Sequence, residues 1–315
     1  MRSGYRTRAI SGGTGPRTFF RVALLGWTLV NWAEAQQPAQ PKTLLDLSGM
    51  AWVEEDLFLA VHDGKNEPDE IAWPRVSLVR LPKFELEGIR WRNLDVAFPG
   101  PQGRSHDLES VCRIPGSRAF LLCESGQKTR KYRRIFHAVL DNENLRIDSY
   151  IPWPVEITNV EASAVARVGG QFVFLYAERA EGLASTDIRW AKLSLEPLKI
   201  GEFQAVSYEA EDPTGERARP IVAMDVDSDG LIHIVSAYDS GNDDGPYRSV
   251  AWRIGKVSAD TQGMPKVELC ERQRLGTLDG LKVESICVRE TPGEEKQVYI
   301  GTDDEHYGGI LRLLP

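Results

Sequence analysis

The sequence predicts an all-β protein, a β-propeller of four-stranded blades, and three observations lead to that prediction. A similar strand opening recurs five times, a hairpin turn follows it, and a second, apolar strand then ends in an acidic residue. The five equivalent positions are 52 to 64 residues apart: Ser48, Glu109, Glu161, Asp225 and Glu284. Repeats that each supply one small sheet are typical of propellers.

Each repeat contains the strands that a blade needs. The second strands are near-continuous apolar runs, which suit strands buried on both faces, and span 57–63, 119–124, 172–178, 232–239 and 298–303. The turns before them include 115–117, 169–170 and 227–230, which are rich in Gly, Pro, Asp and Ser. Third strands are expected at 76–81, 135–140, 188–193, 250–257 and 310–314, and fourth strands at 90–98, 145–153, 202–210 and 267–275.

The repeats predict five blades, with six as the alternative if a divergent blade lies in 201–220 or 255–280. The last repeat stops after its third strand, and residues 42–47 supply a spare strand before the first repeat. We therefore expect N- and C-terminal strands to close the ring in one blade, which removes exposed sheet edges.

The first 35 residues have the pattern of a secretory signal peptide. Five arginines precede the apolar run 22–30, and Ala33-Glu34-Ala35 matches an A-x-A cleavage site. The run is too short for an ordinary transmembrane helix, although an uncleaved anchor is the alternative. We expect a periplasmic or secreted protein in which residues 36–315 form a single propeller domain without a membrane span.

Charge and cysteine spacing restrict the partners. The chain has 38 Lys and Arg against 46 Asp and Glu, and its net charge of −8 becomes −12 without residues 1–35. An acidic surface repels phosphate backbones, so nucleic acid is not an expected partner, and we expect a monomer. The cysteines lack CxxC spacing, which disfavours zinc. Cys112 and Cys123 fall on adjacent strands of one hairpin, and whether they form a disulfide stays open.

The predicted blades place acidic side chains around the mouth of the central funnel. In a propeller the first strand starts, and the second strand ends, at the same face. The predicted metal ligands at this face are Asp63, Glu109, Glu161, Asp225, Asp239, Glu284 and Asp303. So many anions must be protonated, paired with cations or bound to a hard metal, and Ca²⁺ suits six to eight oxygen ligands best. The alternative is that these carboxylates bond backbone amides of adjacent blades.

Further candidates lie at the same face. Glu124 and Glu178 end second strands, and His106 precedes Asp107; these three are the catalytic candidates, with His106 a general base near neutral pH. A basic cluster after Glu124 is predicted to bind an anionic substrate, unless it is only a solvated loop. Its members are Lys128, Arg130, Lys131, Arg133 and Arg134. The segment 225–230 reads D-x-D-x-D-G like the start of an EF-hand loop, but a hairpin turn is the simpler interpretation.

Short motifs resemble the esterase-like phytase family of exported propellers. They are Leu47-Ser48-Gly49-Met50-Ala51, Asp107-Leu108-Glu109-Ser110 and Val283-Glu284-Ser285-Ile286, with acidic strand ends such as 302–305. This resemblance implies calcium-dependent phosphoester hydrolysis. We expect a Ca²⁺-dependent hydrolase of a small anionic ester; the alternatives are a calcium-dependent lactonase and a non-catalytic ligand- or protein-binding propeller with a structural metal.

Overall fold

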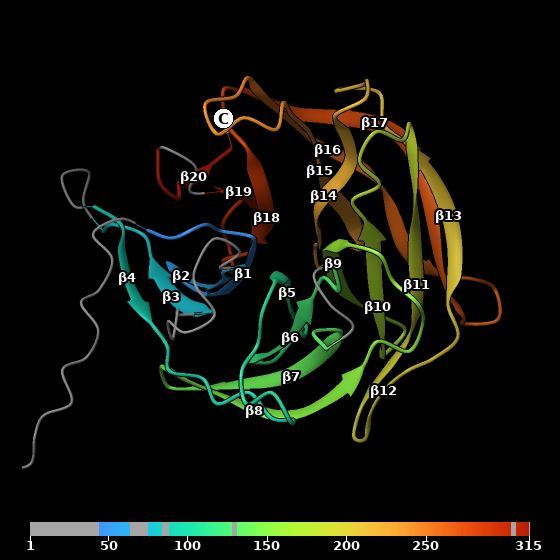
Figure 1. The fold of residues 1–315 in the computed structure, drawn as a ribbon. Helices are drawn as coiled ribbons and strands as arrows, with labels where there is room; N and C mark the ends of the chain where they lie inside the picture. Colours follow the sequence, from blue (N-terminus) through green and yellow to red (C-terminus); the bar gives the residue numbers. More distant parts are fainter. Residues whose placement is uncertain (1–43, 64–74, 84–87, 128–130, 304–306, 315) are drawn as a thin grey trace, which may run out of the picture. The chain divides into compact units, whose positions relative to one another are not determined.

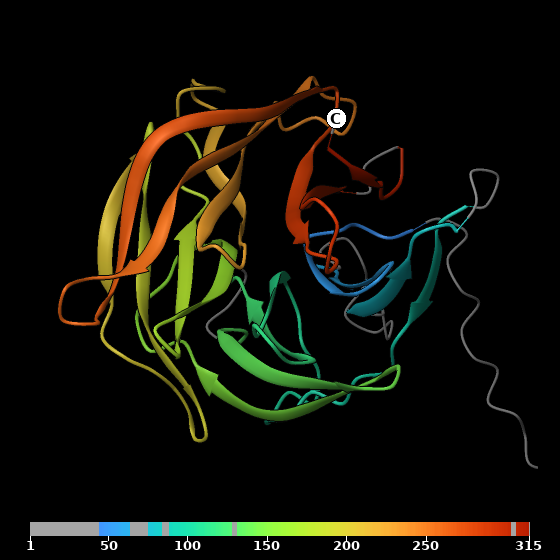
Figure 2. The same cartoon turned by 180° about the vertical axis from the view of Figure 1, so that it is seen from behind.

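Five small antiparallel sheets follow one another along the chain and form the blades of a propeller. The computed structural model of the chain describes residues 44–63, 75–83, 88–127, 131–303 and 307–314, and residues 40–315 make up one compact unit (Figure 1). Figure 2 shows the same ring of blades from behind. The predicted signal peptide and the candidates Lys128 and Arg130 lie outside the described residues.

Each blade begins at the centre of the ring and adds strands outward. Blade 1 contains β1 (Gly49–Glu54), β2 (Leu57–Val61), β3 (Val76–Arg80) and β4 (Arg90–Asn93). Blade 2 contains β5 (Leu108–Arg113), β6 (Ala119–Glu124), β7 (Arg134–Asp141) and β8 (Asn144–Pro152). Blade 4 contains β14 (Ala218–Val226), β15 (Leu231–Asp239), β16 (Tyr247–Ala259) and β17 (Pro265–Asp279).

Two blades depart from four regular strands. Blade 3 contains β9 (Val160–Val168), β10 (Gln171–Glu178) and β11 (Ser185–Leu195), and two strands then pair with β11: β12 (Leu198–Ile200) and β13 (Gln204–Glu209). The described residues of blade 5 form three strands, β18 (Val283–Arg289), β19 (Gln297–Thr302) and β20 (Leu311–Leu313).

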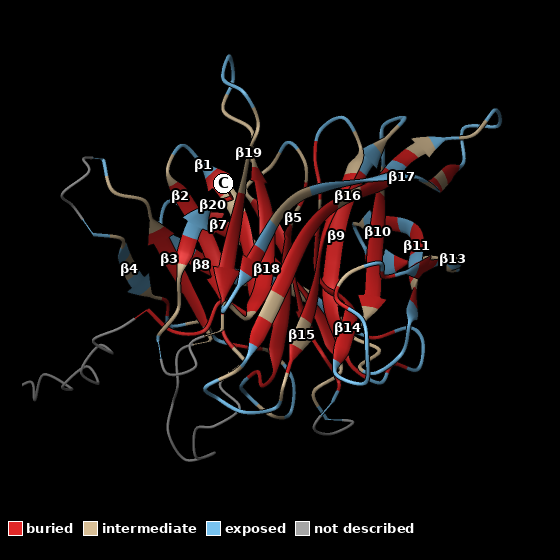
Figure 3. Cartoon of the chain, turned by 90° about the horizontal axis from the view of Figure 1, so that it is seen from above, coloured by how far each residue is buried: buried red, intermediate tan, exposed pale blue. Residues whose placement is uncertain are grey.

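The apolar core lies between the blades. The buried hydrophobic side chains of the described residues fall into five clusters, each shared by two neighbouring blades, including one between blades 5 and 1. Each inner strand contacts the inner strands on both sides, in the order β1, β5, β9, β14, β18 and back to β1. Figure 3 shows these buried strands between exposed loops, with exposed residues on outer strands such as β4. The prediction of five blades rather than six is confirmed.

The two ends of the described chain meet in blade 5. The Leu47 N–H donates to the Thr302 carbonyl oxygen at 2.9 Å, and the Gly309 N–H donates to the Leu44 carbonyl oxygen at 3.0 Å. A Cβ at Gly309 would lie 2.1 Å from the Leu45 carbonyl oxygen, so this approach needs glycine. The N-terminal segment thus closes the ring through hydrogen bonds, although residues 44–47 are not assigned as a strand. No helix in the described part has the length and apolar composition to cross a membrane.

Candidate functional site

Three glutamates enter the mouth of the ring, the end at which the inner strands begin. Glu109, Glu161 and Glu284 each lie at a β-bulge of an inner strand, where the pairing register with the second strand shifts. A bulge turns a side chain out of the regular alternation of the strand. The channel below the mouth, lined by the three glutamates and by serines such as Ser110 and Ser163, holds only about 10 Å³, room for about one water. The channel therefore has no room for a ligand larger than water.

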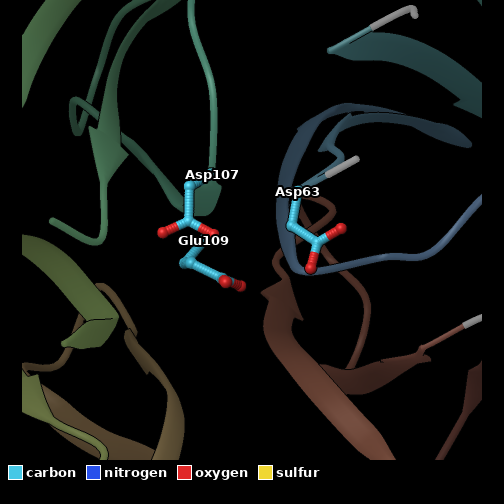
Figure 4. A group of neighbouring side chains, drawn as sticks. All are labelled: Asp63, Asp107 and Glu109. Atoms are coloured by element: carbon cyan, nitrogen blue, oxygen red, sulfur yellow. The ribbon is translucent and has the colours of Figure 1, made fainter. Parts of the chain in front are cut away.

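Carboxylates of blades 1 and 2 converge on one side of the mouth. One oxygen each of Asp63, Asp107 and Glu109 lies within 4.8 Å of the other two (Figure 4). Asp107 and Glu109 are buried, and Asp63 is half-buried at the end of β2. Figure 4 shows Asp107 and Glu109 close together on blade 2, with the Glu109 side chain extending toward Asp63 of blade 1. We call these three residues the carboxylate cluster.

The backbone at Asp107 positions this cluster. Asp107 has φ of 61°, in the left-handed region that few residues other than glycine adopt, although aspartate tolerates it better than most. Its N–H donates to the Asp63 carbonyl oxygen at 3.2 Å, and its own carbonyl oxygen accepts the Ser125 N–H at 3.0 Å. The Ser125 hydroxyl also donates to the Asp107 carboxylate. These contacts hold the junction between blades 1 and 2 in the geometry that the cluster needs.

The carboxylate cluster has the donor atoms and spacing for a hard divalent cation. Calcium–oxygen distances are about 2.3–2.6 Å, so two ligand oxygens on opposite sides of one ion are about 4.6–5.2 Å apart. Every pair of cluster oxygens lies within 4.8 Å, a span that one ion can bridge. Of the predicted metal ligands, the structure therefore brings Asp63 and Glu109 together, and it adds Asp107.

The other acidic residues at the mouth are paired with cations. Glu161 accepts from Arg179 Nη1 at 2.7 Å, and Asp303 is 2.6 Å from Lys282 Nζ. Arg219 Nη2 donates to Asp239 at 2.8 Å, and its Nη1 is 3.6 Å from Glu284. Blades 3 to 5 thus neutralise these carboxylates with protein cations. At blades 1 and 2, Arg75 Nη1 donates to the Asp63 carbonyl oxygen at 2.6 Å, and its guanidinium attracts the carboxylates of Asp63 and Asp107.

The predicted alignment of Asp225 is wrong. Inner strand β14 begins at Ala218, so Arg219 takes the place at the mouth, and Asp225 lies at the other end of the strand, paired with His233. Its two carboxylate oxygens accept the N–H groups of Val226 and Val288, both at 2.8 Å. Burial raises the pKa of Asp225 to about 6, against these two hydrogen bonds. Asp225 therefore joins blades 4 and 5 and is remote from the other predicted ligands.

The structure places the catalytic candidate Glu124 in a buried ion pair. Arg134 donates to one Glu124 oxygen from Nη2 at 2.6 Å and to the other from Nε at 2.9 Å. The Ser105 hydroxyl donates to Glu124 at 2.7 Å. Burial raises the pKa of Glu124, while the bonds from Arg134 and Ser105 oppose that shift. Because both oxygens are occupied and the side chain is fully buried, this geometry favours a structural role for Glu124.

The other two catalytic candidates lie nearer the mouth. Glu178 ends β10, is half-buried and accepts the Thr158 N–H at 3.2 Å. His106 is buried next to Asp107 in the sequence, and its ring stacks on Tyr132 with centroids 5.2 Å apart. His106 therefore adjoins the carboxylate cluster along the chain, while its ring packs against Tyr132.

The basic cluster is dispersed among its described members. Arg134 belongs to the buried pair with Glu124, and Arg133 pairs with the exposed Glu156 at 3.0 Å. Lys131 is exposed. The described basic residues therefore do not form one anion site, because Arg133 and Arg134 pair with different carboxylates.

Lys296 occupies the centre of the loop that resembles an EF-hand. Its Nζ is 3.0 Å from Asp227, 2.8 Å from Asp229 and 2.9 Å from Glu290. An ammonium group thus takes the place that a calcium ion takes in an EF-hand loop. The hairpin interpretation of the segment 225–230 fits the structure, in which the loop joins β14 to β15.

We predict that Lys296→Met converts this loop into a weak cation site. Without the ammonium group the three carboxylates repel one another, so the free energy of unfolding should fall by about 1–2 kcal/mol. Added Ca²⁺ should raise the melting temperature of the variant more than that of the wild type. The matched control is Lys266→Met, since Lys266 forms a single exposed pair with Glu268 at 2.7 Å. Equal calcium responses of all three proteins would contradict the prediction.

The disulfide left open by the sequence is absent from the described structure. Cys112 and Cys123 are free, and they pair with Leu121 and Ser110 respectively rather than with each other. Both thiols lie 3.6 Å from the Ser163 hydroxyl. Burial is the main cause that raises the pKa of Cys112, so its thiol is protonated at neutral pH.

The sequence-based candidates omit several residues that shape the mouth. Asp107 was quoted only as part of a motif, because a residue just before a strand gives no sign of a left-handed backbone. Arg179, Arg219 and Lys282 were not singled out either. Arg179 directly follows Glu178, and Lys282 lies two residues before Glu284, so their closeness to acidic candidates was the available signal. Arg219 could be found only by knowing where β14 begins.

Comparisons with known proteins bear on the fold. No family model matches the sequence, and no curated protein matches it. Among solved structures, a glycoside hydrolase aligns over 86% of this chain with a TM-score of 0.50 and 12% identity, and this chain covers 60% of its length. A thermostable family-43 glycoside hydrolase aligns over 88% of this chain and 90% of its own length, with a TM-score of 0.47 and 13% identity. An α-L-arabinofuranosidase from Clostridium thermocellum aligns over 84% of this chain and 88% of its own length, with a TM-score of 0.46 and 11% identity. At 12% identity the first match shows the propeller fold alone.

Proposed function

We propose that the protein is an exported, divalent-cation-dependent ester hydrolase whose site is the carboxylate cluster. The observation that carries the proposal is the convergence of Asp63, Asp107 and Glu109 at the mouth, with oxygens within 4.8 Å of one another. These three residues would hold the ion, most suitably Ca²⁺. A bound cation supplies polarisation of an ester oxygen and a lowered pKa of water.

The protein contributes rigidity and a base. Asp107 and Glu109 are buried, and the bonds from Ser125 and to Asp63 fix the backbone between them. His106, the residue before Asp107 in the chain, would take a proton from water. Because these groups belong to inner strands and their junctions, the site needs no large rearrangement to bind a cation.

The ion pairs of the described arginines favour an uncharged carboxylic ester or lactone over a phosphoester. Arg133 and Arg134 are engaged by Glu156 and Glu124. Arg179 pairs with Glu161 and Glu181, and Arg219 pairs with Asp239 and Glu284. A phosphate would have to displace these carboxylates from their cations, which costs the energy of the existing pairs. The second candidate function is therefore a phytase-like phosphoesterase, which would use the same site but hydrolyse phosphoesters instead of carboxylic esters or lactones.

Turnover with and without a chelator tests the proposal. The purified protein is assayed with lactones, carboxylic esters and phosphoesters, in Ca²⁺ and in EDTA, beside Asp107→Asn and Asp225→Asn. We expect Ca²⁺-dependent hydrolysis of a lactone or ester that falls by about a hundredfold or more in Asp107→Asn, since the ion is lost. Asp225→Asn is the matched control, because Asp225 lies at the other end of its strand.

Three outcomes are informative. Turnover of phosphoesters alone would contradict the choice of substrate. A melting temperature that depends on Ca²⁺ without turnover of any substrate would replace the hydrolase with a binding propeller that holds a structural metal. Activity that persists in EDTA would contradict cation dependence.

A further inference from the structure

An open pocket of about 800 Å³ lies on blades 4 and 5, apart from the carboxylate cluster of blades 1 and 2. Its walls come from the segment before β14, the loop between β15 and β16 and the turn between β17 and β18, with Tyr307 from the segment before β20. Most of its lining residues are half-buried or exposed, so solvent reaches the pocket. A pocket of this size can hold a small organic molecule.

Tyrosines of neighbouring blades line this pocket. The rings of Tyr247 in β16 and Tyr307 in blade 5 have centroids 6.5 Å apart and planes at 79° to each other. The Tyr247 hydroxyl donates to the Asn242 carbonyl oxygen at 2.7 Å, and the Tyr307 hydroxyl accepts the Lys282 N–H at 3.0 Å. Tyr307 nevertheless stays 38% exposed. The pocket thus offers aromatic surface that is held in place, and the face of such a ring attracts cations.

The carboxylates among the described lining residues outnumber the cations. The basic side chain of the lining is Arg248, and the acidic ones are Asp212, Asp243, Asp244 and Asp279. Arg248 donates to the two oxygens of Asp212 at 3.0 and 2.7 Å and to Asp279 at 2.5 Å. Arg274 is also 3.2 Å from Asp212, so two arginines balance these two aspartates. Asp243 and Asp244 add exposed negative charge from the loop after β15.

The combination of aromatic rings and carboxylates selects the charge of the ligand. A phosphate or carboxylate ligand would be repelled by the aspartates, and Arg248 is already engaged by two of them. A neutral apolar ligand would use the tyrosine rings but not the negative charge. An ammonium group on a small apolar body is attracted by both the ring faces and the carboxylates.

We propose that this pocket is a second ligand site, for a small organic cation whose ammonium group is bound by the tyrosine rings and the aspartates of the loop after β15. The inference goes beyond the proposed hydrolysis, because binding here requires neither a divalent cation nor turnover at the carboxylate cluster.

Ligand-observed NMR, in Ca²⁺ and again in EDTA, tests this pocket. The ammonium probes are choline and n-butylamine. The compounds 3,3-dimethyl-1-butanol and 3,3-dimethylbutanoate serve as the neutral and anionic analogues of choline. The pocket variants are Tyr307→Leu and Asp244→Asn, and melting curves establish that each is folded.

Control variants match these substitutions away from the pocket. Tyr150 in β8 is 38% exposed, like Tyr307, so Tyr150→Leu is the control for loss of an exposed ring. Asp141 is exposed at the end of β7, so Asp141→Asn is the control for loss of an exposed charge. Asp107→Asn removes a carboxylate from the carboxylate cluster and therefore separates the two sites.

We expect at least one ammonium probe to bind, and its Kd to rise by about threefold or more in Tyr307→Leu and in Asp244→Asn, because a ring face or a charge is lost. The controls and Asp107→Asn should keep the Kd of the wild type, and both analogues of choline should bind more weakly than choline. The pocket is contradicted if neither ammonium probe binds, if 3,3-dimethyl-1-butanol binds as tightly as choline, or if Asp107→Asn weakens binding as much as the pocket variants do. Since the readout is binding, failure of cation-dependent turnover leaves this result unaffected, and the reverse also holds.

Discussion

Replacing Arg134 by alanine is expected to lower the free energy of unfolding by about 3–5 kcal/mol, the cost of removing one partner from a buried ion pair. Glu124 is fully buried and receives two hydrogen bonds from the Arg134 side chain, so the substitution leaves a buried carboxylate without its cation. Arg134 also donates to the carbonyl oxygens of Pro99 and Arg104, which ties the loop before β5 to blade 2. The melting temperature should fall by on the order of 10 °C.

The adjacent arginine provides the control for this prediction. Arg133 pairs with Glu156, which is 85% exposed, and such pairs contribute about 0–1 kcal/mol. Arg133→Ala should therefore change the melting temperature by only a few degrees. Chemical denaturation of the two variants compares them directly. Similar losses of stability in both would show that the buried pair with Glu124 has no special structural role.

The second large effect concerns the pH dependence of stability at Asp225. Its folded-state pKa of about 6 lies above the ordinary value of 3.8. Between pH 4 and 6 the folded state binds the proton more tightly than the unfolded state, so the contribution of Asp225 to stability decreases as the pH rises. The difference in unfolding free energy, wild type minus Asp225→Asn, should fall by about 2–3 kcal/mol from pH 4 to pH 7.

The contribution of Asp227 to stability should depend on pH in the opposite direction. The pKa of Asp227 is lowered to about 2, because hydrogen bonds from His233, Leu231 and Lys296 outweigh its burial. Its contribution is present above pH 3.8 and is lost as the pH falls through 2. The difference between wild type and Asp227→Asn should therefore increase from pH 2 to pH 4. Urea denaturation across these ranges measures both differences, and a flat curve for Asp225→Asn would refute the shift of its pKa.

The strand order could be predicted from sequence because it rests on local chemistry. Apolar runs such as 119–124 and 172–178 are buried on both faces, and the turns before them carry the expected glycines. The number of blades followed from the spacing of the repeats. The closure of the ring was less regular than predicted, because residues 44–47 form no strand there: the Leu47 N–H donates to Thr302 and the Leu44 carbonyl oxygen accepts from Gly309.

The candidate site could be predicted only in part, because it depends on register and long-range pairing. In blade 4 the pairing register shifts between Arg219 and Ala223, and no sequence pattern marks where β14 begins. The motif-based alignment therefore took Asp225 for the residue at the mouth. The ion pairs that neutralise Glu161 and Asp303 join side chains 18 and 21 residues apart, in geometry that only the folded blades create.

Calorimetric titration of the protein with Ca²⁺ tests the central claim most directly, namely that the carboxylate cluster binds a divalent cation. We predict binding of one ion to the wild type, loss of that binding in Asp107→Asn, and its retention in Asp225→Asn, whose carboxylate lies at the far end of an inner strand. Absence of binding to the wild type, or equal binding to Asp107→Asn and the wild type, would contradict the assignment of the cluster.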